Sequence, residues 1–421
     1  MNDKQKPSIR FKGFTEAWEQ RKLSSLCDKF TDGDWIEAKD QSSSGVRLIQ
    51  TGNVGIAEYI DKPNNKKWVS NNTFEALHCE EVFEGDILIS RLPEPAGRAC
   101  IVPNLGTKMI TAVDCTIVRV SENTSNEFLL QYLSSQKYFD EVNTCLAGGT
   151  RQRISRSNLA NFDVPIPTKK KEQEAIGSFF NHLDHLITLH QRKYDKLVNV
   201  KKSMLEKMFP RDGKNVPEIR FSGFTEAWEQ RKLSEIATMH ARIGWQNLRT
   251  SEFLDSGNYM LITGTDFEDG AINFDTCHYV ERERYEQDKH IQIKNGSILI
   301  TKDGTLGKVA YVQGLSMPAT LNAGVFNVEI KDETKVDNKY LFQYLKAPYL
   351  MDYVDKKATG GTIKHLNQNI LIDFPVVMPS KQEQWLIGAY FNQLDYLITL
   401  HQREVEKLQN IKKSCLEKMF A

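Results

Sequence analysis

Residues Glu172–Phe209 read EQEAIGSFFNHLDHLITLHQRKYDKLVNVKKSMLEKMF, and residues Glu383–Phe420 read EQWLIGAYFNQLDYLITLHQREVEKLQNIKKSCLEKMF. The two stretches are identical at 26 of 38 positions, at an offset of 211 residues. Mostly apolar residues recur in both at alternating spacings of four and three, which is the heptad pattern of a coiled coil. The seam defined by this spacing contains Ile176, Phe180, Leu183, Ile187, His190, Tyr194 and Leu197, and then Ile387, Phe391, Leu394, Ile398, His401, Val405 and Leu408.

This pattern predicts two long helices, each about 57 Å long at about 1.5 Å per residue. Two such helices in one chain pack most simply on each other, and a pseudo-twofold relation between the halves makes them antiparallel. His190 and His401 hold equivalent seam positions, which favours a pair of satisfied seam histidines over the alternative, a register or pH device. His182 and His185 are replaced in the second copy, so we expect solvated or packed side chains there rather than metal ligands.

A shorter repeat precedes each half. Pro7–Ser24 reads PSIRFKGFTEAWEQRKLS and Pro217–Ser234 reads PEIRFSGFTEAWEQRKLS, identical at 16 of 18 positions. Between the repeats the halves diverge but keep a skeleton, since Gly85–Ser90 (GDILIS) corresponds to Gly296–Thr301 (GSILIT). A period near 210 residues indicates a tandem duplication of whole domains and not a solenoid.

Short β-branched runs in each half predict strands, and a helical segment follows them. The expected strands are 47–53, 86–90, 99–103 and 115–120, then 259–266, 297–301, 309–312 and 324–330, with helices at 126–142 and 337–354. The fold class is therefore mixed α/β, in two domains of similar fold. The expected boundaries are 1–168 for the first domain, 169–209 for the first long helix, 210–379 for the second domain and 380–421 for the second helix.

Composition excludes several classes of protein. The chain has 421 residues, with 55 Lys and Arg against 55 Asp and Glu. No apolar run approaches the about 18 residues that cross a bilayer, and the polar start leads into no apolar segment, so we expect neither a membrane span nor a signal peptide. The seven cysteines show no C-x-x-C spacing. That pattern fits neither a zinc ribbon nor a disulfide framework, and it favours the cytoplasm.

The sequence contains no catalytic motif that we recognise. A P-loop, the Asn-Pro-Pro-aromatic tetrapeptide of amino-methyltransferases, an H-E-x-x-H zinc motif and a G-x-S-x-G elbow are all missing. The carboxylate–lysine sets of nucleases are too degenerate to exclude from a single sequence. We therefore expect no catalytic residue and no metal site in this chain.

Basic residues surround a Gly-Gly-Thr loop in each half, and residues 145–160 and 356–366 contain no acid. Backbone N–H groups and cations that converge on one anion suit a phosphate backbone, so these loops predict DNA contacts; the alternative is a solvated loop. The residues are Gly148, Gly149, Thr150, Arg151, Arg153 and Arg156 in the first half, and Gly360, Gly361, Thr362, Lys364 and His365 in the second.

Four further cations follow equivalent strands: Arg91 and Arg98 in the first half, and Lys302 and Lys308 in the second. Arg or Lys bound to guanine is the commonest direct base contact, so we expect these residues to contact DNA with different preferences in the two halves. The zero net charge does not oppose this, because acidic stretches such as 75–86 offset the basic loops.

Two divergent domains that alternate with near-identical helices resemble the specificity (S, HsdS) subunit of type I restriction–modification enzymes. The resemblance rests on the duplicated GFTEAWEQRKLS block, the duplicated LDxLITLHQR…KKSxLEKMF helix and the paired Gly-Gly-Thr loops, and it covers essentially the whole chain. It implies two target-recognition domains, 1–168 and 210–379, each reading one half of a bipartite, asymmetric site in double-stranded DNA.

The resemblance also implies that the helices set the gap between the half-sites. They would dock two methyltransferase (M) subunits and, through them, two restriction (R) subunits around a single S chain. S-adenosylmethionine, ATP and Mg²⁺ would belong to those partners, and this chain would be a non-catalytic subunit that methylation and ATP-dependent cleavage require. The alternatives are a recognition subunit of a type IIB or phage-exclusion system, a self-contained endonuclease or methyltransferase, and a coiled-coil adaptor that binds no DNA.

Overall fold

The computed structural model describes residues 7–149, 152–210, 213–304, 306–357 and 366–420, and the chain divides into two compact units. The first unit comprises Met1–Arg192 with Gln402–Ala421, and the second comprises Lys193–His401. Helices α5 (Lys170–Lys207) and α11 (Lys381–Phe420) each pass from one unit into the other. Each unit therefore contains one α/β domain, part of its own long helix and part of the long helix of the other repeat.

The structure contains neither a helix suited to a membrane nor a disulfide among its described residues. Across the described residues, no helix combines the length and apolarity that a membrane crossing requires. All seven cysteines are free, so no disulfide holds either unit together.

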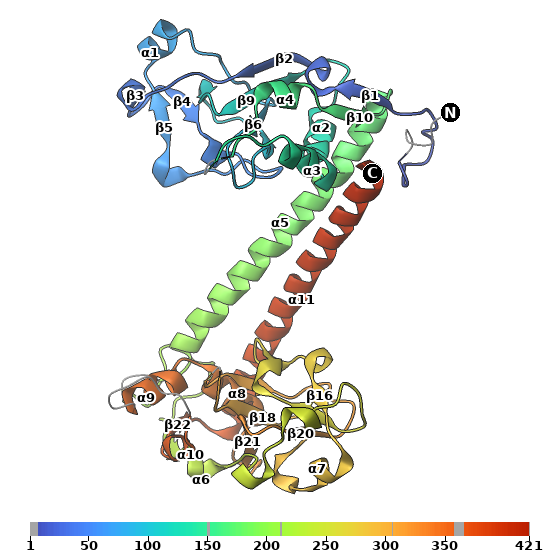
Figure 1. Ribbon diagram of the computed structural model, residues 1–421. Coiled ribbons are helices and arrows are strands. Elements are labelled where there is room, and N and C mark those ends of the chain that lie inside the picture. The colour runs from blue at the N-terminus through green and yellow to red at the C-terminus, as the bar shows by residue number, and fades with distance from the viewer. Residues whose placement is uncertain (1–6, 150–151, 211–212, 305, 358–365, 421) are drawn as a thin grey trace. The chain divides into compact units, whose positions relative to one another are not determined.

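The first unit contains two four-stranded sheets and a two-stranded sheet. The strand orders are β2-β9-β6-β7, β3-β5-β4-β8 and β1-β10. Its elements are β1 Glu19–Lys22, β2 Cys27–Asp32, β3 Gln41–Ser42, β4 Val46–Ile49, β5 Lys67–Val69, α1 Asn71–Ala76, β6 Ile87–Ser90, β7 Ala99–Ile101, β8 Met109–Thr111, β9 Cys115–Val120, α2 Asn126–Tyr132, α3 Gln136–Thr144, α4 Arg156–Ala160 and β10 Asp163–Ile166 (Figure 1).

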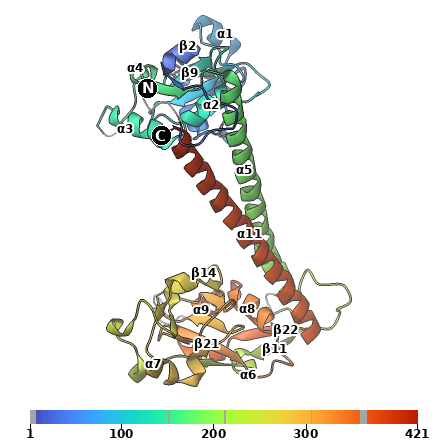
Figure 2. The same cartoon turned by 90° about the vertical axis from the view of Figure 1, so that its right-hand side faces the viewer.

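The second unit repeats this plan with the orders β12-β21-β18-β19, β16-β13-β20-β17 and β11-β22, and adds the hairpin β14-β15. Its elements are β11 Glu229–Lys232, α6 Leu233–Ile236, β12 Ala237–His240, β13 Met260–Ile262, β14 Phe267–Glu268, β15 Ala271–Ile272, β16 His278–Tyr279, α7 Arg282–Glu286, β17 Gln292–Ile293, β18 Ile298–Thr301, β19 Val309–Tyr311, β20 Ala319–Leu321, β21 Val325–Ile330, α8 Asn338–Lys346, α9 Tyr349–Lys357, α10 Gln368–Ile372 and β22 Pro375–Met378 (Figure 2).

The central strand of each domain is buried on both faces. In β6, Ile87 and Ile89 pack with the helices, whereas Leu88 faces a separate core formed with the second sheet. In β18 the same alternation places Ile298 and Ile300 on one side and Leu299 on the other. Side chains of a strand alternate between faces, so a sheet covered on both sides requires a continuous apolar run. This explains why the ILI of the Gly-x-Ile-Leu-Ile skeleton survives in both copies.

The helix predicted at 126–142 is wrong in detail, because two helices form there. Ser135 separates α2 from α3, and its hydroxyl accepts a hydrogen bond from the Tyr138 N–H, which caps α3. In the second domain Pro348 lies between α8 and α9. Serine caps and proline both favour a new helix start over continuation, and the apolar periodicity concealed these breaks.

Helices α5 and α11 contain 38 and 40 residues. All fourteen predicted seam residues are buried or half-buried, whereas His182 and His185 are exposed. Within the first unit Asp184 pairs with Lys412, and nearer the start of α5 Ile176 shares a core with Phe420. Residue numbers therefore rise along one helix as they fall along the other, which confirms an antiparallel arrangement.

The ends of the seam pack into the domains as well as on the partner helix. In the first unit, one core contains side chains from the domain, from the start of α5 and from the end of α11: Trp18, Phe128, Ile176, Phe180, Leu183, Leu416, Met419 and Phe420. In the second unit the corresponding core contains Trp228, Tyr340, Ile387, Phe391, Leu394, Leu205, Met208 and Phe209. Each domain core is thus completed by the helix end of the other repeat.

A buried ion pair attaches each N-terminal repeat block to its long helix. The Arg10 guanidinium donates to both carboxylate oxygens of Glu172 at 2.6 and 2.7 Å, and Trp18 Nε1 donates to the same carboxylate at 3.2 Å. In the second unit Arg220 donates to both oxygens of Glu383 at 2.7 and 2.8 Å. A carboxylate buried this deeply needs a charged partner, so the arginine and the glutamate are retained in both copies.

A polar contact also joins the two long helices to the domain in the first unit. Lys412 Nζ donates to Asp184 Oδ1 at 2.6 Å, and Gln131 Nε2 of α2 donates to Asp184 Oδ2 at 3.4 Å. One carboxylate therefore contacts α11 and the domain at the same time.

The second unit contains the equivalent contact with one additional cation. Asp395 accepts from Lys201 and, at 2.8 Å, from Gln343 Nε2 of α8. Lys346 Nζ lies 3.8 Å from the same carboxylate and donates to the Asp269 carbonyl oxygen. Burial lowers the pKa of Lys346 to about 8, because the charged form loses hydration and the neighbouring Lys201 repels it.

We predict that Lys346→Met removes a pH-dependent part of the free energy of unfolding. The pKa of Lys346 is lower in the folded chain, so between pH 8 and 10 the unfolded chain binds more protons and this contribution rises with pH. Urea unfolding at pH 8 and pH 9.5 should show the wild type gaining on the order of 1 kcal/mol relative to Lys346→Met.

The control for this experiment is Lys294→Met, which removes an exposed lysine of the same unit. Its difference from the wild type should not change with pH. An equally flat difference for Lys346→Met would contradict the prediction.

Candidate nucleic-acid interface

Three arginines of the first domain converge on two carboxylates. Arg156 Nε lies 3.9 Å from Asp32 Oδ2, and Arg91 Nη2 lies 3.4 Å from the same oxygen. Arg153 Nη1 lies 3.9 Å from Asp114 Oδ1. The side chains of Arg153 and Arg156 remain 62% and 46% exposed, so the carboxylates orient them without covering them. The two aspartates were not found from sequence, because they lie far from the arginines along the chain.

The glycine loop lies beside these arginines. Ala147 and Arg153 form an antiparallel bridge with hydrogen bonds of 3.1 and 2.9 Å in the two directions. Between them Gly148 has φ of +115°, a conformation that favours glycine, and a Cβ on Gly149 would meet no atom within 4 Å. Thr150 and Arg151 lie outside the described residues. The described part of the predicted loop, Gly148 and Gly149, therefore lies beside Arg153, with open space next to Gly149.

The second domain has the same backbone arrangement with lysines. The Leu366 N–H donates to the Lys302 carbonyl at 2.8 Å, as the Ile154 N–H donates to the Arg91 carbonyl at 3.2 Å. Lys302 Nζ lies 5.4 Å from the centre of the Phe326 ring, and Lys308 is exposed. Gly360, Gly361, Thr362, Lys364 and His365 lie outside the described residues.

Arg98 does not belong to this site, which corrects the sequence-based prediction. Its guanidinium donates to five backbone carbonyls at 2.7–3.0 Å, those of Thr51, Val54, Leu92, Pro93 and Pro95. An arginine that holds two segments together in this way, 51–54 and 92–95, has few donors left for a base. Burial also lowers the pKa of its guanidinium. An arginine is a suitable residue for a DNA contact, but the sequence did not show that backbone carbonyls from distant residues surround this one.

Arg91 is also mostly internal. Its side chain is 11% exposed, and Nη2 donates to the Val113 carbonyl at 2.6 Å. The backbone of Arg91 holds the segment that follows Arg153 in place, because its carbonyl accepts a hydrogen bond from the Ile154 N–H. Arg91 is better placed to position the exposed arginines than to reach a base itself.

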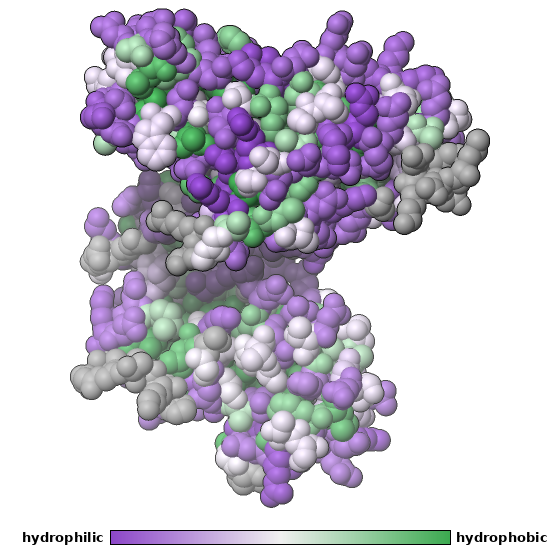
Figure 3. Space-filling view, turned by 45° about the horizontal axis from the view of Figure 1, so that its top comes forward, coloured by the Kyte–Doolittle hydropathy of each residue, from purple (hydrophilic) through white to green (hydrophobic). Residues whose placement is uncertain are grey.

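Some residues are identical in the two copies although they are exposed. The GFTEAWEQRKLS block is largely exposed apart from its tryptophan and Leu23 or Leu233, and its second copy lines a cleft of about 700 Å³. The run LITLHQR is identical in α5 and α11, and its Leu189 and Leu400 are 38% and 39% exposed. The face of the two domains seen in Figure 3 is mostly hydrophilic with small apolar patches. The exposed leucines at matching positions of the two helices indicate a surface that occurs twice in the chain and is available for contact.

Comparisons with known proteins agree with this duplicated architecture. The family model for the type I restriction modification DNA specificity domain matches residues 15–199 and again residues 225–410. The type I restriction enzyme MjaVIII specificity subunit of Methanocaldococcus jannaschii is 23% identical over 373 residues, which cover 86% of this chain and 81% of that protein. The putative MjaX specificity subunit of the same organism is 21% identical over 411 residues, covering 95% and 92%.

The fold has also been seen in a solved structure. The S subunit of a type I restriction–modification system from M. genitalium superposes with a TM-score of 0.62 at 17% sequence identity, over 99% of both chains. The family model covers both halves, and the shared fold extends over the whole length. This chain therefore belongs to the family of type I restriction–modification specificity subunits, and it carries two specificity domains.

Proposed function

We propose that each specificity domain reads one half of a bipartite, asymmetric site in double-stranded DNA. The observation that carries this proposal is that equivalent backbone presents different side chains in the two domains. The Arg91 carbonyl accepts the Ile154 N–H beside the exposed Arg153 and Arg156. The Lys302 carbonyl accepts the Leu366 N–H in the same way, and the exposed cation of that domain is Lys308. A shared scaffold with different side chains at the same place suits two readers of different sequences. Phosphate contacts fix the register of such a reader, and base-edge contacts give it specificity.

The arginine site provides the phosphate contacts of the first domain. Arg153 and Arg156 are exposed and are oriented by the carboxylates of Asp114 and Asp32. Gly148 and Gly149, which have no side chains, let a DNA backbone approach closely. Lys302 and Lys308 have this role in the second domain, together with the predicted residues Gly360, Gly361, Thr362, Lys364 and His365.

Catalysis is assigned to partner subunits. The sequence contains no methyltransferase or nucleotide-binding motif that we recognise, so S-adenosylmethionine, ATP and Mg²⁺ are assigned to the M and R subunits. This chain then contributes recognition and assembly to methylation and to ATP-dependent cleavage.

Replacing Arg153 and Arg156 by alanine should weaken DNA binding and reduce its salt dependence. Each lost phosphate contact lowers the slope of log affinity against log salt by about 0.9, so the double variant should lose about 2. The measurement is DNA binding by the complex with its M subunits, by fluorescence anisotropy over a salt series.

Lys193→Ala is the control, since it removes an exposed cation of α5 outside the recognition domains. Its slope should equal that of the wild type. An unchanged slope and affinity in the double arginine variant would favour a coiled-coil adaptor that binds no DNA through this chain.

The long helices are proposed to dock two identical M subunits, and through them two R subunits, on a single S chain. The supporting observation is the exposed leucine in the identical LITLHQR run of each helix. Two copies of one partner require two equal surfaces, whereas an asymmetric DNA site requires two unequal ones. The identical and divergent parts of the chain match these two requirements.

Leu189→Lys and Leu400→Lys should each remove one M subunit, and the double variant should remove both. A lysine ammonium cannot be buried cheaply in an apolar contact, so the affected surface loses its partner. Native mass spectrometry of the co-expressed complex reads the stoichiometry directly.

Val198→Lys is the matched control, because Val198 is also 38% exposed on α5. Its counterpart in α11 is Gln409, so it does not belong to a surface that is identical in the two helices. The control complex should keep two M subunits. Two M subunits retained by the double leucine variant would place the docking surface elsewhere.

We also propose that the helices set the gap between the half-sites. The division between the two units falls after Arg192 in α5 and after His401 in α11, so residues inserted at these positions leave the contacts within each unit intact. An insertion of seven residues keeps the heptad phase and adds about 10 Å to each helix.

Seven residues inserted after Arg192 and after His401 should lengthen the gap by about three base pairs at about 3.4 Å per pair. Both half-sites should stay the same, because neither domain is altered. Sequencing of methylated bases in a host that carries the variant measures gap and half-sites together. A changed half-site would mean that the helices contribute to base recognition.

A further inference from the structure

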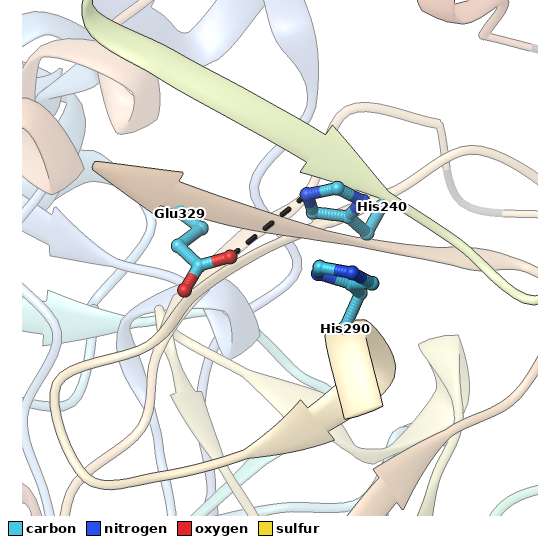
Figure 4. A group of neighbouring side chains, drawn as sticks. All are labelled: His240, His290 and Glu329. Atoms are coloured by element: carbon cyan, nitrogen blue, oxygen red, sulfur yellow. Dashed lines mark ion pairs between the residues drawn. The ribbon is translucent and has the colours of Figure 1, made fainter. Parts of the chain in front are cut away.

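Three side chains of the kinds that ligate metal ions lie close together in the second domain. His240 ends β12, Glu329 lies on β21, and His290 lies on the 3₁₀ turn Lys289–Ile291 (Figure 4). One ligand atom from each lies within 4.8 Å of the other two, and no other group of three meets this criterion in the described part of the chain. The sequence predicted no metal site, since these residues are 50 and 39 positions apart.

The backbone holds the three residues in place. Strands β12 and β21 pair antiparallel with His240 opposite Asn327, so Glu329 is the diagonal neighbour of His240 on the same face. The side chain of Asn327 donates to the His290 carbonyl at 3.0 Å, and the His290 N–H donates to Asp288 at 2.9 Å. Two strands and a turn are thus fixed relative to one another beneath the three side chains.

The side chains themselves are accessible and close to one another. His240 Nε2 lies 3.8 Å from Glu329 Oε2 and 3.1 Å from the Thr238 hydroxyl. The two imidazoles stack with centres 4.4 Å apart and planes at 21°. His290 and Glu329 are exposed and His240 is half-buried, so a solute reaches the cluster directly.

We propose that His240, His290 and Glu329 bind one divalent transition-metal ion of the zinc class. Imidazole nitrogen with carboxylate oxygen is a ligand set that Zn²⁺ takes at about 2.0–2.2 Å, and three protein ligands leave a coordination position for water. The three ligand atoms must move about 1 Å closer to one another before all of them lie at this distance from a single ion. One imidazole must also turn out of the stack, because each nitrogen lone pair lies in its ring plane and two nearly parallel planes do not direct both lone pairs at one ion. The exposed His290 has the freedom to turn.

The cluster belongs to the divergent part of the fold. At the offset of 210 residues, His240 corresponds to Phe30 and Glu329 to Arg119, neither of which matches this ligand set. The shared scaffold therefore does not require these residues, and Arg119 forms an ion pair with Asp86 in the first domain instead. Bound metal would tie β12 and β21 to the turn that leads into β17, and so stabilise the second domain alone.

Titration of the metal-free full-length chain with Co²⁺ tests the proposal, because its visible spectrum reports the ligand type. We expect one equivalent bound with the bands of nitrogen and oxygen ligands, and displacement by Zn²⁺. His290→Ala and Glu329→Gln should each weaken binding at least about tenfold, the size of a lost ligand contact. Zn²⁺ should also raise the Tm of the wild type by about 2 °C or more, and not that of the variants.

His182→Ala, which removes an exposed histidine of α5, should bind like the wild type. The metal-free variants should unfold at the temperature of the wild type, since both replaced side chains are exposed. Binding that persists in His290→Ala and Glu329→Gln would overturn the proposal. A thiolate charge-transfer band would overturn it too, because it would place the metal on the free cysteines.

Discussion

Each domain core depends on an aromatic residue at the far end of the other repeat's long helix or just after it: Phe420 ends α11, and Phe209 follows α5 by two residues. Phe420 packs against Trp18 and Phe128 in the first unit, with ring centres 6.1 and 5.6 Å apart. Phe209 stacks on Phe391 in the second unit at 5.8 Å and 12°. Loss of one buried phenylalanine typically costs about 3–5 kcal/mol. Neither half of the chain therefore contains a complete core of its own, and the pairing of the helices follows from this exchange.

The polar contacts reinforce the exchange. Lys412 reaches Asp184 in one unit and Lys201 reaches Asp395 in the other, and in both a glutamine of the domain shares the carboxylate. Such partly buried pairs specify one register, because any shift along the seam would leave charges unpaired. Apolar packing supplies the attraction, and the ion pairs select the alignment.

The two copies separate what the fold needs from what differs between the domains. Arg10 and Glu172 recur as Arg220 and Glu383 because a buried carboxylate cannot lose its cation. The residues beside the glycine loops differ between the copies, and in the first domain Arg153 and Arg156 are exposed and carry no packing constraint. Unequal loops on equal scaffolds are what an asymmetric DNA site and a symmetric pair of partners would together require.

The long helices and the central strands could be predicted from the sequence, because each produces a local pattern of apolar residues. The heptad spacing predicted both long helices, in which the residues it assigned to the seam are buried or half-buried, and the Ile-Leu-Ile runs predicted the central strands β6 and β18. Periodicity did not reveal the break at Ser135, where a capping side chain outweighs helix propensity. Nor could it show that Arg98 donates to backbone carbonyls of two separate segments, or that His240, His290 and Glu329 lie close together.

The sequence by itself therefore determined the duplicated plan and the division into constant and variable parts, because these follow from comparing the two copies. It also determined the long helices, because these follow from apolar spacing over a few residues. Only the tertiary structure decided which helix end completes which core, which arginines remain open to a phosphate, and which distant side chains converge. Those outcomes depend on contacts between residues far apart in the chain, and no local pattern encodes them.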